Sequence, residues 1–119
     1  HQCLSGLNQD KKNYNIVATN KELRLFFSWD SVKSETNLRK HGVRFEVAKL
    51  VFDDPLHITR QDRIEGGELS WQTIGMAGGV ALLLVAHTWR ETESDQEHIR
   101  IISARRATRL ERKVYEQDP

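Results

Sequence analysis

The sequence predicts an α+β fold in which an antiparallel β-sheet packs against helices, in the element order β-α-α-β-β-β-β-α. Two observations support this prediction. Helix caps and helical spacing of apolar residues are confined to residues 30–52 and to the C-terminal end. Between them, residues 56–104 contain short alternating or continuous apolar runs, separated by glycine pairs and one polar loop. Because strands joined by such short connections pair antiparallel, we expect one antiparallel sheet.

The first half of the chain is predicted to contain one strand and two helices. The aromatic segment 23–29 has the composition of a strand. Asp30 supplies an N-cap oxygen and Gly42 a left-handed C-terminal residue, so a helix is expected between them. Cationic side chains in its last turn suit the negative end of the helix dipole. A second, shorter helix is expected over residues 45–52, ended by two aspartates and a proline.

The second half is predicted to contain four strands and a terminal helix. Two strands are indicated by alternation of apolar and polar residues, a central strand by a run that is apolar on both faces, and the last strand by its isoleucines. These strands are expected to start at Leu56, Glu68, Val80 and His98. Residues 105–116 have the weak amphipathic spacing of a terminal helix.

Length and composition indicate one domain. A chain of 119 residues buries one ordinary core, and we expect a domain over residues 23–119. Residues 1–22 are polar and are interpreted as an arm that is non-native or disordered, since the chain starts without methionine. The single cysteine, Cys3, excludes an internal disulfide and a cysteine-built metal site, and it fits a reducing cytosol. No apolar run is long enough to span a membrane, so a cytoplasmic location is expected.

Positive charge is concentrated where the last strand becomes the last helix. The net charge is only +1, so any anion binding must depend on the arrangement of charges. Strict alternation would place Arg105 on the face of Ile101 and Ser103, and Arg106 on the opposite face. Guanidinium groups at a strand end suit bidentate contacts with phosphate. The equally supported alternative is a solvated helix whose cations pair with nearby acids.

Other polar residues are candidates for a site, each with a structural alternative. Lys40 and His41 could contact phosphate, although a cation at a helix C-terminus is most often only a cap. His87 shares a strand face with apolar residues, which favours a buried structural role over catalysis. Arg90 opens a loop and can reach a ligand. Glu68 could act as a base, but pairing with an arginine is slightly favoured.

Several established motifs are absent from the sequence. There is no Walker loop, dinucleotide-binding glycine motif, HExxH, CxxC or Gly-x-Ser-x-Gly. The five histidines are too scattered to predict a zinc site. The three tryptophans, Trp29, Trp71 and Trp89, are dispersed, which favours packing over base stacking. These absences leave the basic residues as the main functional signal.

Together, four segments resemble the BrnT family, whose members are toxins of bacterial type II toxin–antitoxin pairs. The resemblance runs from about residue 27 to 116 and is carried by FSWDSVKSETNLRKHGVRFEVAKLVFDDP, GGELSWQTIG, LLLVAHTWRE and IRIISARRATRLERKVYE. It implies a RelE-like fold and a metal-independent ribonuclease without a cofactor. The implied partners are an RNA substrate and a BrnA-type ribbon-helix-helix antitoxin, which alone would contact DNA; a membrane is not implied. Ser70 stands where relatives often have arginine, which predicts one phosphate contact fewer, and Arg44 stands where they often have serine or aspartate.

This resemblance suggests roles for the candidate residues. RNA can be cleaved by its own 2′-hydroxyl, so the protein must bind the phosphate, stabilise the extra charge and move protons. The predicted catalytic set is Glu68 as base, Arg90 and Arg105 at the phosphate, and His41 as acid or second cation; Lys40, Arg106 and Arg109 are predicted to bind RNA. The alternative is a module that binds nucleic acid or the antitoxin through the same basic surface without catalysis.

Overall fold

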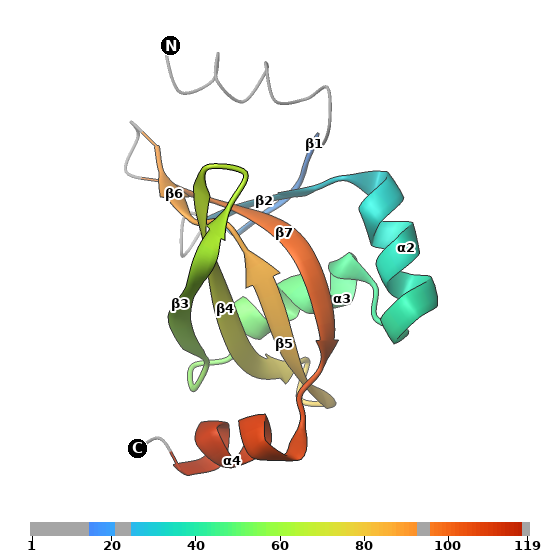
Figure 1. Ribbon diagram of the computed structural model, residues 1–119, viewed down its shortest axis with the longest axis vertical. Helices are drawn as coiled ribbons and strands as arrows, with labels where there is room; N and C mark the ends of the chain where they lie inside the picture. The colour runs from blue at the N-terminus through green and yellow to red at the C-terminus, as the bar shows by residue number, and fades with distance from the viewer. Residues whose placement is uncertain (1–14, 21–24, 93–95, 118–119) are drawn as a thin grey trace.

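The protein has an α+β fold built on one mixed sheet (Figure 1). The computed structural model describes residues 15–20, 25–92 and 96–117. The strands follow the spatial order β1-β2-β7-β5-β4-β3, and β6 pairs with β7. In chain order the elements are β1 (Asn15–Asn20), β2 (Leu25–Trp29), α2 (Ser31–His41), α3 (Phe45–Ala48), the 3-10 helix η1 (Lys49–Asp53), β3 (Ile58–Glu65), β4 (Glu68–Ala77), β5 (Ala81–His87), β6 (Arg90–Glu91), β7 (Glu97–Arg106) and α4 (Arg109–Gln117).

The predicted fold class and the order of the main elements are confirmed. Asp30 caps α2 by accepting the amide of Val32, and Gly42 ends it in the left-handed conformation. The structure differs in three places. Residues 15–20, predicted as part of an irregular arm, form β1; the second helix changes to 3-10 geometry after Ala48; and β6 lies in the predicted loop. The rest of the predicted arm, including Cys3, lies outside the described residues.

One strand pair departs from the antiparallel prediction. Residues 25–28 of β2 pair with residues 97–100 of β7 in parallel. The antiparallel expectation rested on short connections between consecutive strands, and β3, β4 and β5 obey it. No short connection joins β2 to β7, because most of the domain lies between them in sequence. The direction in which β2 pairs with β7 is therefore not set by a short turn.

The apolar core has two parts on opposite faces of the sheet. The larger core packs α3 and η1 against β2, β5 and β7, and includes the fully buried side chains of Phe45, Val51 and Val85. The smaller core, on the other face, consists of Ile74, Leu82 and Leu84 with Met76, Ala107 and Tyr115 packed beside them. We refer to these two sides of the sheet as the larger-core face and the smaller-core face.

A β-bulge in β7 changes which face its last residues occupy. Ile101 lies opposite His87, yet Ala104 lies opposite Val85, so three steps of β7 span two steps of β5. Arg105 consequently lies opposite Leu84, on the smaller-core face. Strict alternation placed it on the face of Ile101, and that prediction was wrong. Since one extra residue reverses the side of every residue after it, the bulge brings Arg105 to the face that carries Arg100.

Asn37 holds α2 along the free edge of β7. The pairing of β7 with β2 ends at Arg100, and among the described residues the Asn37 amide takes the place of a partner strand beyond it. Its Nδ2 donates to the Ala104 carbonyl at 2.8 Å and to the Val43 carbonyl at 3.0 Å, while its Oδ1 accepts the Ala104 amide at 3.1 Å. Residues four apart share a helix face, so Lys33 and His41 lie on the stripe of α2 that faces β7.

Candidate active site

A cleft opens on the smaller-core face, between the first turns of α2, the start of β4 and the middle of β7. Its volume is about 390 Å³, and its lining includes one acid, two cations and two hydroxyl groups. The lining residues are Lys33, Gly66, Glu68, Ser70, Thr88, Arg100 and Ile102. The sheet supplies most of these side chains, so the cleft has rigid walls. This cleft is the strongest candidate for the active site.

Glu68 is the acid of the cleft, and two arginines hold it. Arg100 Nη2 lies 2.9 Å from Glu68 Oε1, and Arg90 Nε lies 3.8 Å from Glu68 Oε2. The pairing favoured for Glu68 from the sequence is therefore confirmed. The side chains of Glu68 and Arg100 are 34% and 25% exposed, so solvent and small anions can reach them. A carboxylate in this position can accept a proton, and the guanidinium groups can bind an anionic group nearby.

Sequence reasoning missed two residues of the cleft. Arg100 was given no role, although it stands in the predicted last strand. Lys33 was not considered, although its spacing of four residues from Asn37 and eight from His41 is readable in the sequence. The relevant signal was this helical stripe, but only the contact of Asn37 with Ala104 shows that it faces β7.

Arg105 is paired in a different way, at the far end of β7. Its two terminal nitrogens donate to the two carboxylate oxygens of Glu111, each at 2.8 Å. Glu111 also accepts the Thr108 amide, and the Thr108 hydroxyl accepts the Glu111 amide, which is a capping box at the start of α4. The hydrogen bond from Arg105 lowers the pKa of Glu111 to about 2, and Glu111 in turn raises the pKa of Arg105. This end of β7 anchors α4.

A second polar contact fixes α4 near its C-terminal end. The Tyr115 hydroxyl donates to Asp54 Oδ2 at 2.6 Å, and Asp54 also accepts the backbone amides of Met76 and Leu56. Burial, and then the hydrogen bond to Asp54, raises the pKa of Tyr115 to about 12. The pKa of Asp54 is lowered, because these hydrogen bonds outweigh its partial desolvation. Glu111 and Tyr115 thus hold the two ends of a helix that has no fully buried residue.

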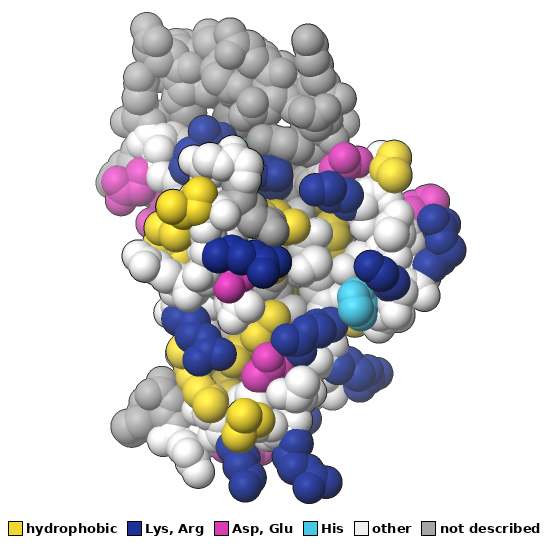
Figure 2. Space-filling view, in the orientation of Figure 1, with side chains coloured by type: hydrophobic (Ala, Val, Ile, Leu, Met, Phe, Trp, Pro, Cys, Tyr) yellow, Lys and Arg dark blue, Asp and Glu magenta, His cyan; other side chains and the backbone are white. Residues whose placement is uncertain are grey.

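The remaining predicted residues lie outside the cleft. Lys40, His41, Arg106 and Arg109 are exposed. Eight residues of helix separate His41 from Lys33, a rise of about 12 Å, so the two are not at the same phosphate. Figure 2 shows basic side chains spread over this side of the molecule, with acidic side chains beside several of them. The structure therefore brings Glu68 and Arg90 together, and distributes the other predicted residues along α2 and the end of β7.

Comparison with protein-family models gives a match over residues 29–111, which is more than half of the chain. The matching family is described as the ribonuclease toxin BrnT of type II toxin–antitoxin systems. The chain belongs to the BrnT family. Membership gives it the family's coarse function, a ribonuclease toxin with an RNA substrate and an antitoxin partner. The match contains every residue that lines the cleft.

A solved structure provides a second comparison. The crystal structure of the Brucella abortus ribonuclease toxin BrnT matches with a TM-score of 0.47 and 22% sequence identity, covering 68% of this chain and 94% of that one. A search of curated proteins found no match.

Ser70, where the sequence resemblance predicted the loss of one arginine contact, is a buried member of the cleft. Its hydroxyl donates to the Arg63 carbonyl at 2.8 Å, across the irregular part of the β3–β4 pair. An arginine at this position would start from the cleft wall beside Glu68. The sequence departure therefore lies in the cleft itself, and the side chains of Lys33 and Arg100 supply the positive charge there.

His87 has the buried structural role that was predicted from its strand face. It is 1% exposed, and burial lowers its pKa to about 4, so the ring is neutral at pH 7. The packing role predicted for the tryptophans is confirmed: Trp29 meets Phe45, and Trp71 and Trp89, distant in sequence, meet edge to face with ring centroids 5.2 Å apart. In the described segments no three histidine, cysteine, aspartate or glutamate side chains are grouped to hold a metal ion. No helix among those segments has the length and apolar character needed to cross a membrane.

Proposed function

We propose that the protein is an endoribonuclease that cleaves RNA in the cleft without a metal, using the substrate 2′-hydroxyl as the nucleophile. One observation supports this most directly: the Glu68 carboxylate lies between Arg100 and Arg90, in a cleft that Lys33 also lines. A proton acceptor and phosphate-binding cations thus occupy one rigid site. Attack of the 2′-hydroxyl on the adjacent phosphorus requires both kinds of group.

Glu68 acts as the general base in this mechanism. It accepts the proton of the 2′-hydroxyl while the oxygen attacks the adjacent phosphorus. General acid–base assistance of this kind contributes roughly a hundred- to ten-thousandfold. The phosphate binds to the guanidinium groups that hold Glu68 in the free protein, because phosphate and carboxylate accept the same bidentate hydrogen bonds. Substrate binding therefore places the base and the phosphate side by side.

The cations stabilise the pentacoordinate state. Arg90, Arg100 and Lys33 carry three positive charges, and Glu68 becomes neutral when it takes the proton. These charges face the two negative charges of the phosphorane, and a positioned donor of this type contributes about a hundred- to a thousandfold. Metal independence is supported by this supply of protein charge. Lys33 is the proposed proton donor to the leaving 5′-oxygen, since a guanidinium does not release its proton in proteins.

The exposed basic residues extend the site along the RNA. We propose that Lys40, His41, Arg106 and Arg109 contact phosphates flanking the scissile one. The Asn37–Ala104 contact supports this, because it aligns α2 with β7 and so orders the helix stripe along the strand. Arg105 was predicted to contact the transition state. Its bidentate contact with Glu111 favours a role in holding α4 instead.

The partner is proposed to be a BrnA-type antitoxin with a ribbon-helix-helix fold. Family membership supports the existence of an antitoxin, and the resemblance carried by the four sequence segments suggests its type. Co-expression tests the pairing. The toxin expressed alone should arrest growth, and co-expression with the neighbouring antitoxin gene should restore it. Equal toxicity with and without that gene product would contradict the pairing.

The catalytic proposal is tested by incubating purified protein with bulk RNA in EDTA. Cleavage should persist in EDTA and fall at least about a hundredfold in Glu68→Gln. Glu116→Gln is the matched control, because Glu116 also pairs with an arginine, Arg112, but lies on exposed α4. Cleavage that EDTA abolishes and magnesium restores would overturn metal independence. RNA retention without cleavage would support the alternative of a non-catalytic binding module.

A further inference from the structure

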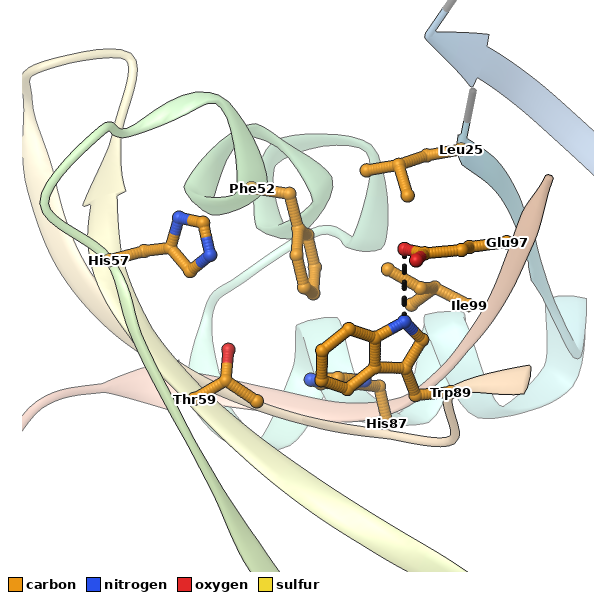
Figure 3. Close-up of a pocket in the computed structure, with 8 residues that line it drawn as sticks. All are labelled: Leu25, Phe52, His57, Thr59, His87, Trp89, Glu97 and Ile99. Atoms are coloured by element: carbon orange, nitrogen blue, oxygen red, sulfur yellow. Dashed lines mark hydrogen bonds between the residues drawn. The ribbon is translucent and has the colours of Figure 1, made fainter. Parts of the chain in front are cut away.

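A second pocket lies on the larger-core face, where β5 ends and β6 begins. Its volume is about 180 Å³, larger than a cavity of about 150 Å³ that accepts benzene. Figure 3 shows the Phe52 and Trp89 rings on its walls, with Leu25 and Ile99 beside them. Trp89 is 40% exposed, so one wall is reached from solvent. The pocket suits a flat ligand with apolar faces.

Thr59 presents a hydrogen-bond acceptor to this pocket. The His87 Nδ1 lies 2.8 Å from the Thr88 carbonyl, which only accepts, so the neutral ring carries its proton on Nδ1. His87 Nε2 therefore accepts the Thr73 hydroxyl proton at 2.7 Å. Because that proton is committed, the Thr59 hydroxyl donates to Thr73, also at 2.7 Å. The oxygen of Thr59 retains lone pairs but has no proton left to offer.

His57 and Glu97 present acceptors as well. His57 Nδ1 lies 2.7 Å from the Asp54 carbonyl and donates to it, so in the neutral ring Nε2 is an acceptor. Glu97 Oε1 accepts the Trp89 indole N–H at 3.1 Å, and Figure 3 shows the carboxylate at the pocket above that ring. A carboxylate has about four lone-pair sites, so both Glu97 oxygens can accept from a ligand while Oε1 holds the indole. The polar groups that face the pocket are thus acceptors, around apolar and aromatic walls.

We propose that this pocket binds a guanine base of the RNA. Guanine presents two adjacent donors, N1–H and N2–H, which match the two oxygens of one carboxylate. Adenine and cytosine place a ring-nitrogen acceptor beside their amino group, and uracil places a carbonyl on each side of its single donor, so each would set a lone pair against Glu97. Aromatic side chains that stack on splayed bases and polar groups that read their edges are the usual means of single-stranded RNA recognition.

The pocket and the cleft are connected through one short segment. Along residues 87–90, successive side chains alternate between the two faces of the sheet. His87 and Trp89 line the pocket, whereas Thr88 lines the cleft and Arg90 contacts Glu68. An RNA strand that passes around this end of the sheet would place a phosphate in the cleft and a neighbouring base in the pocket. This inference rests on the proposed ribonuclease function and assigns it a base preference.

Cleavage of defined oligonucleotides tests the preference. Single-stranded uridine-rich RNAs carry one guanosine, adenosine or cytidine at successive positions, and kcat/KM is measured for each. The wild type should cleave the guanosine series at least about tenfold faster, at a fixed distance from the guanosine. Glu97→Gln and Thr59→Val should each reduce this preference, Glu97→Gln by about tenfold. Glu91→Gln is the matched control, because Glu91 lies opposite Glu97 on β6 but does not line the pocket.

Direct binding of nucleotides keeps the test independent of catalysis. The Trp89 indole N–H signal is identified by NMR from its absence in Trp89→Phe, and the protein is titrated with GMP, AMP, CMP and UMP. GMP alone should shift this signal, and Glu97→Gln should weaken the shift. If wild-type protein does not cleave RNA but GMP shifts the signal, the proposed function fails and the guanine site stands. Absence of a GMP shift, a guanosine preference unchanged in Glu97→Gln, or loss of antitoxin binding alone in that variant would overturn the guanine site.

Discussion

Two arginine–glutamate pairs on β7 use the same chemistry for different purposes. Arg100 pairs with Glu68 and Arg105 pairs with Glu111, both on the smaller-core face. Five residues of strand separate the two arginines, a distance of about 15 Å. The Arg105–Glu111 pair has two contacts of 2.8 Å, whereas the contact of Arg100 with Glu68 is a single one of 2.9 Å. The surroundings of the two carboxylates differ even more.

The Arg105–Glu111 pair, which we call the clamp because it holds α4, differs from a binding site in how its acceptor atoms are used. Glu111 is 17% exposed, and its two oxygens accept hydrogen bonds from Arg105 and from the Thr108 amide. A substrate phosphate would have to break a helix cap to reach Arg105. Glu68 is 34% exposed and faces a cleft, and its second oxygen lies 3.8 Å from Arg90, a longer contact than either one to Glu111. The number of nearby charges does not distinguish the two pairs. What distinguishes them is whether the carboxylate oxygens already accept short hydrogen bonds within the protein.

The largest expected effect is on catalysis at the cleft. Arg100→Ala should lower kcat/KM for RNA about a hundred- to a thousandfold, because it removes a positioned cation from the phosphate. Arg112→Ala, on exposed α4, is the control for loss of one positive charge. Rates are compared for variants that remain folded by circular dichroism. Equal rates for the two variants would show that the Arg100–Glu68 pair is only structural.

The pH dependence of stability should separate the clamp from the core. His87 has a folded pKa of about 4, below its usual 6.5, so the unfolded chain binds more protons and stability falls as the pH drops from 6.5 toward 4. The loss is about 3 kcal/mol at most. Glu111, with a pKa of about 2 in place of 4.5, contributes stability above pH 4.5 that is lost toward pH 2. Denaturant unfolding across pH measures both windows.

Two variants show which residue causes each loss of stability. Glu111→Gln should remove the loss between pH 4.5 and 2 (the lower window) and leave the loss between pH 6.5 and 4 (the upper window) unchanged. His87→Gln should do the reverse, because its side chain does not titrate. A lower window that persists in Glu111→Gln would mean that another carboxylate, and not the clamp, causes the acid sensitivity.

Arg105→Ala should act mainly on stability. It removes two charge-assisted hydrogen bonds at a partly exposed site, and we expect a loss of about 1.5 kcal/mol in the free energy of unfolding. Cleavage by the folded variant should fall less than about tenfold, well short of the Arg100→Ala effect. Thermal unfolding and initial rates provide the two readouts. A loss of activity in Arg105→Ala as large as in Arg100→Ala would restore Arg105 to the catalytic set.

Tyr115→Phe should have the smallest effect. The change removes one hydrogen bond to Asp54, which still accepts the amides of Met76 and Leu56, so the cost is about 1 kcal/mol. RNA cleavage should be unchanged. Because Tyr115 and Arg105 anchor the same helix, the double variant should lose less stability than the sum of the two single variants. Full additivity would indicate that the two ends of α4 come loose independently.

Local features of this chain were predictable because their causes lie within a few residues. The caps of α2 at Asp30 and Gly42, the glycine turns and the central strand all depend on neighbours in sequence. The resemblance carried by four sequence segments indicated the family, and the match over residues 29–111 confirmed it. Glu68 and Arg90 were identified as site candidates by their places at element ends, which the structure brings together.

The tertiary structure decided how these pieces meet. The parallel pairing of β2 with β7 joins segments distant in sequence, and the bulge that moves Arg105 across the sheet depends on register with β5. Lys33 became part of the cleft only because Asn37 fixes α2 against β7. The same holds for the two arginines, which both lie in a strand with basic residues and look alike in the sequence. The acid that each one contacts makes Arg100 part of a site and Arg105 part of a clamp. Residue types and caps are properties of short segments, whereas the partner of a long side chain is set by packing between distant ones.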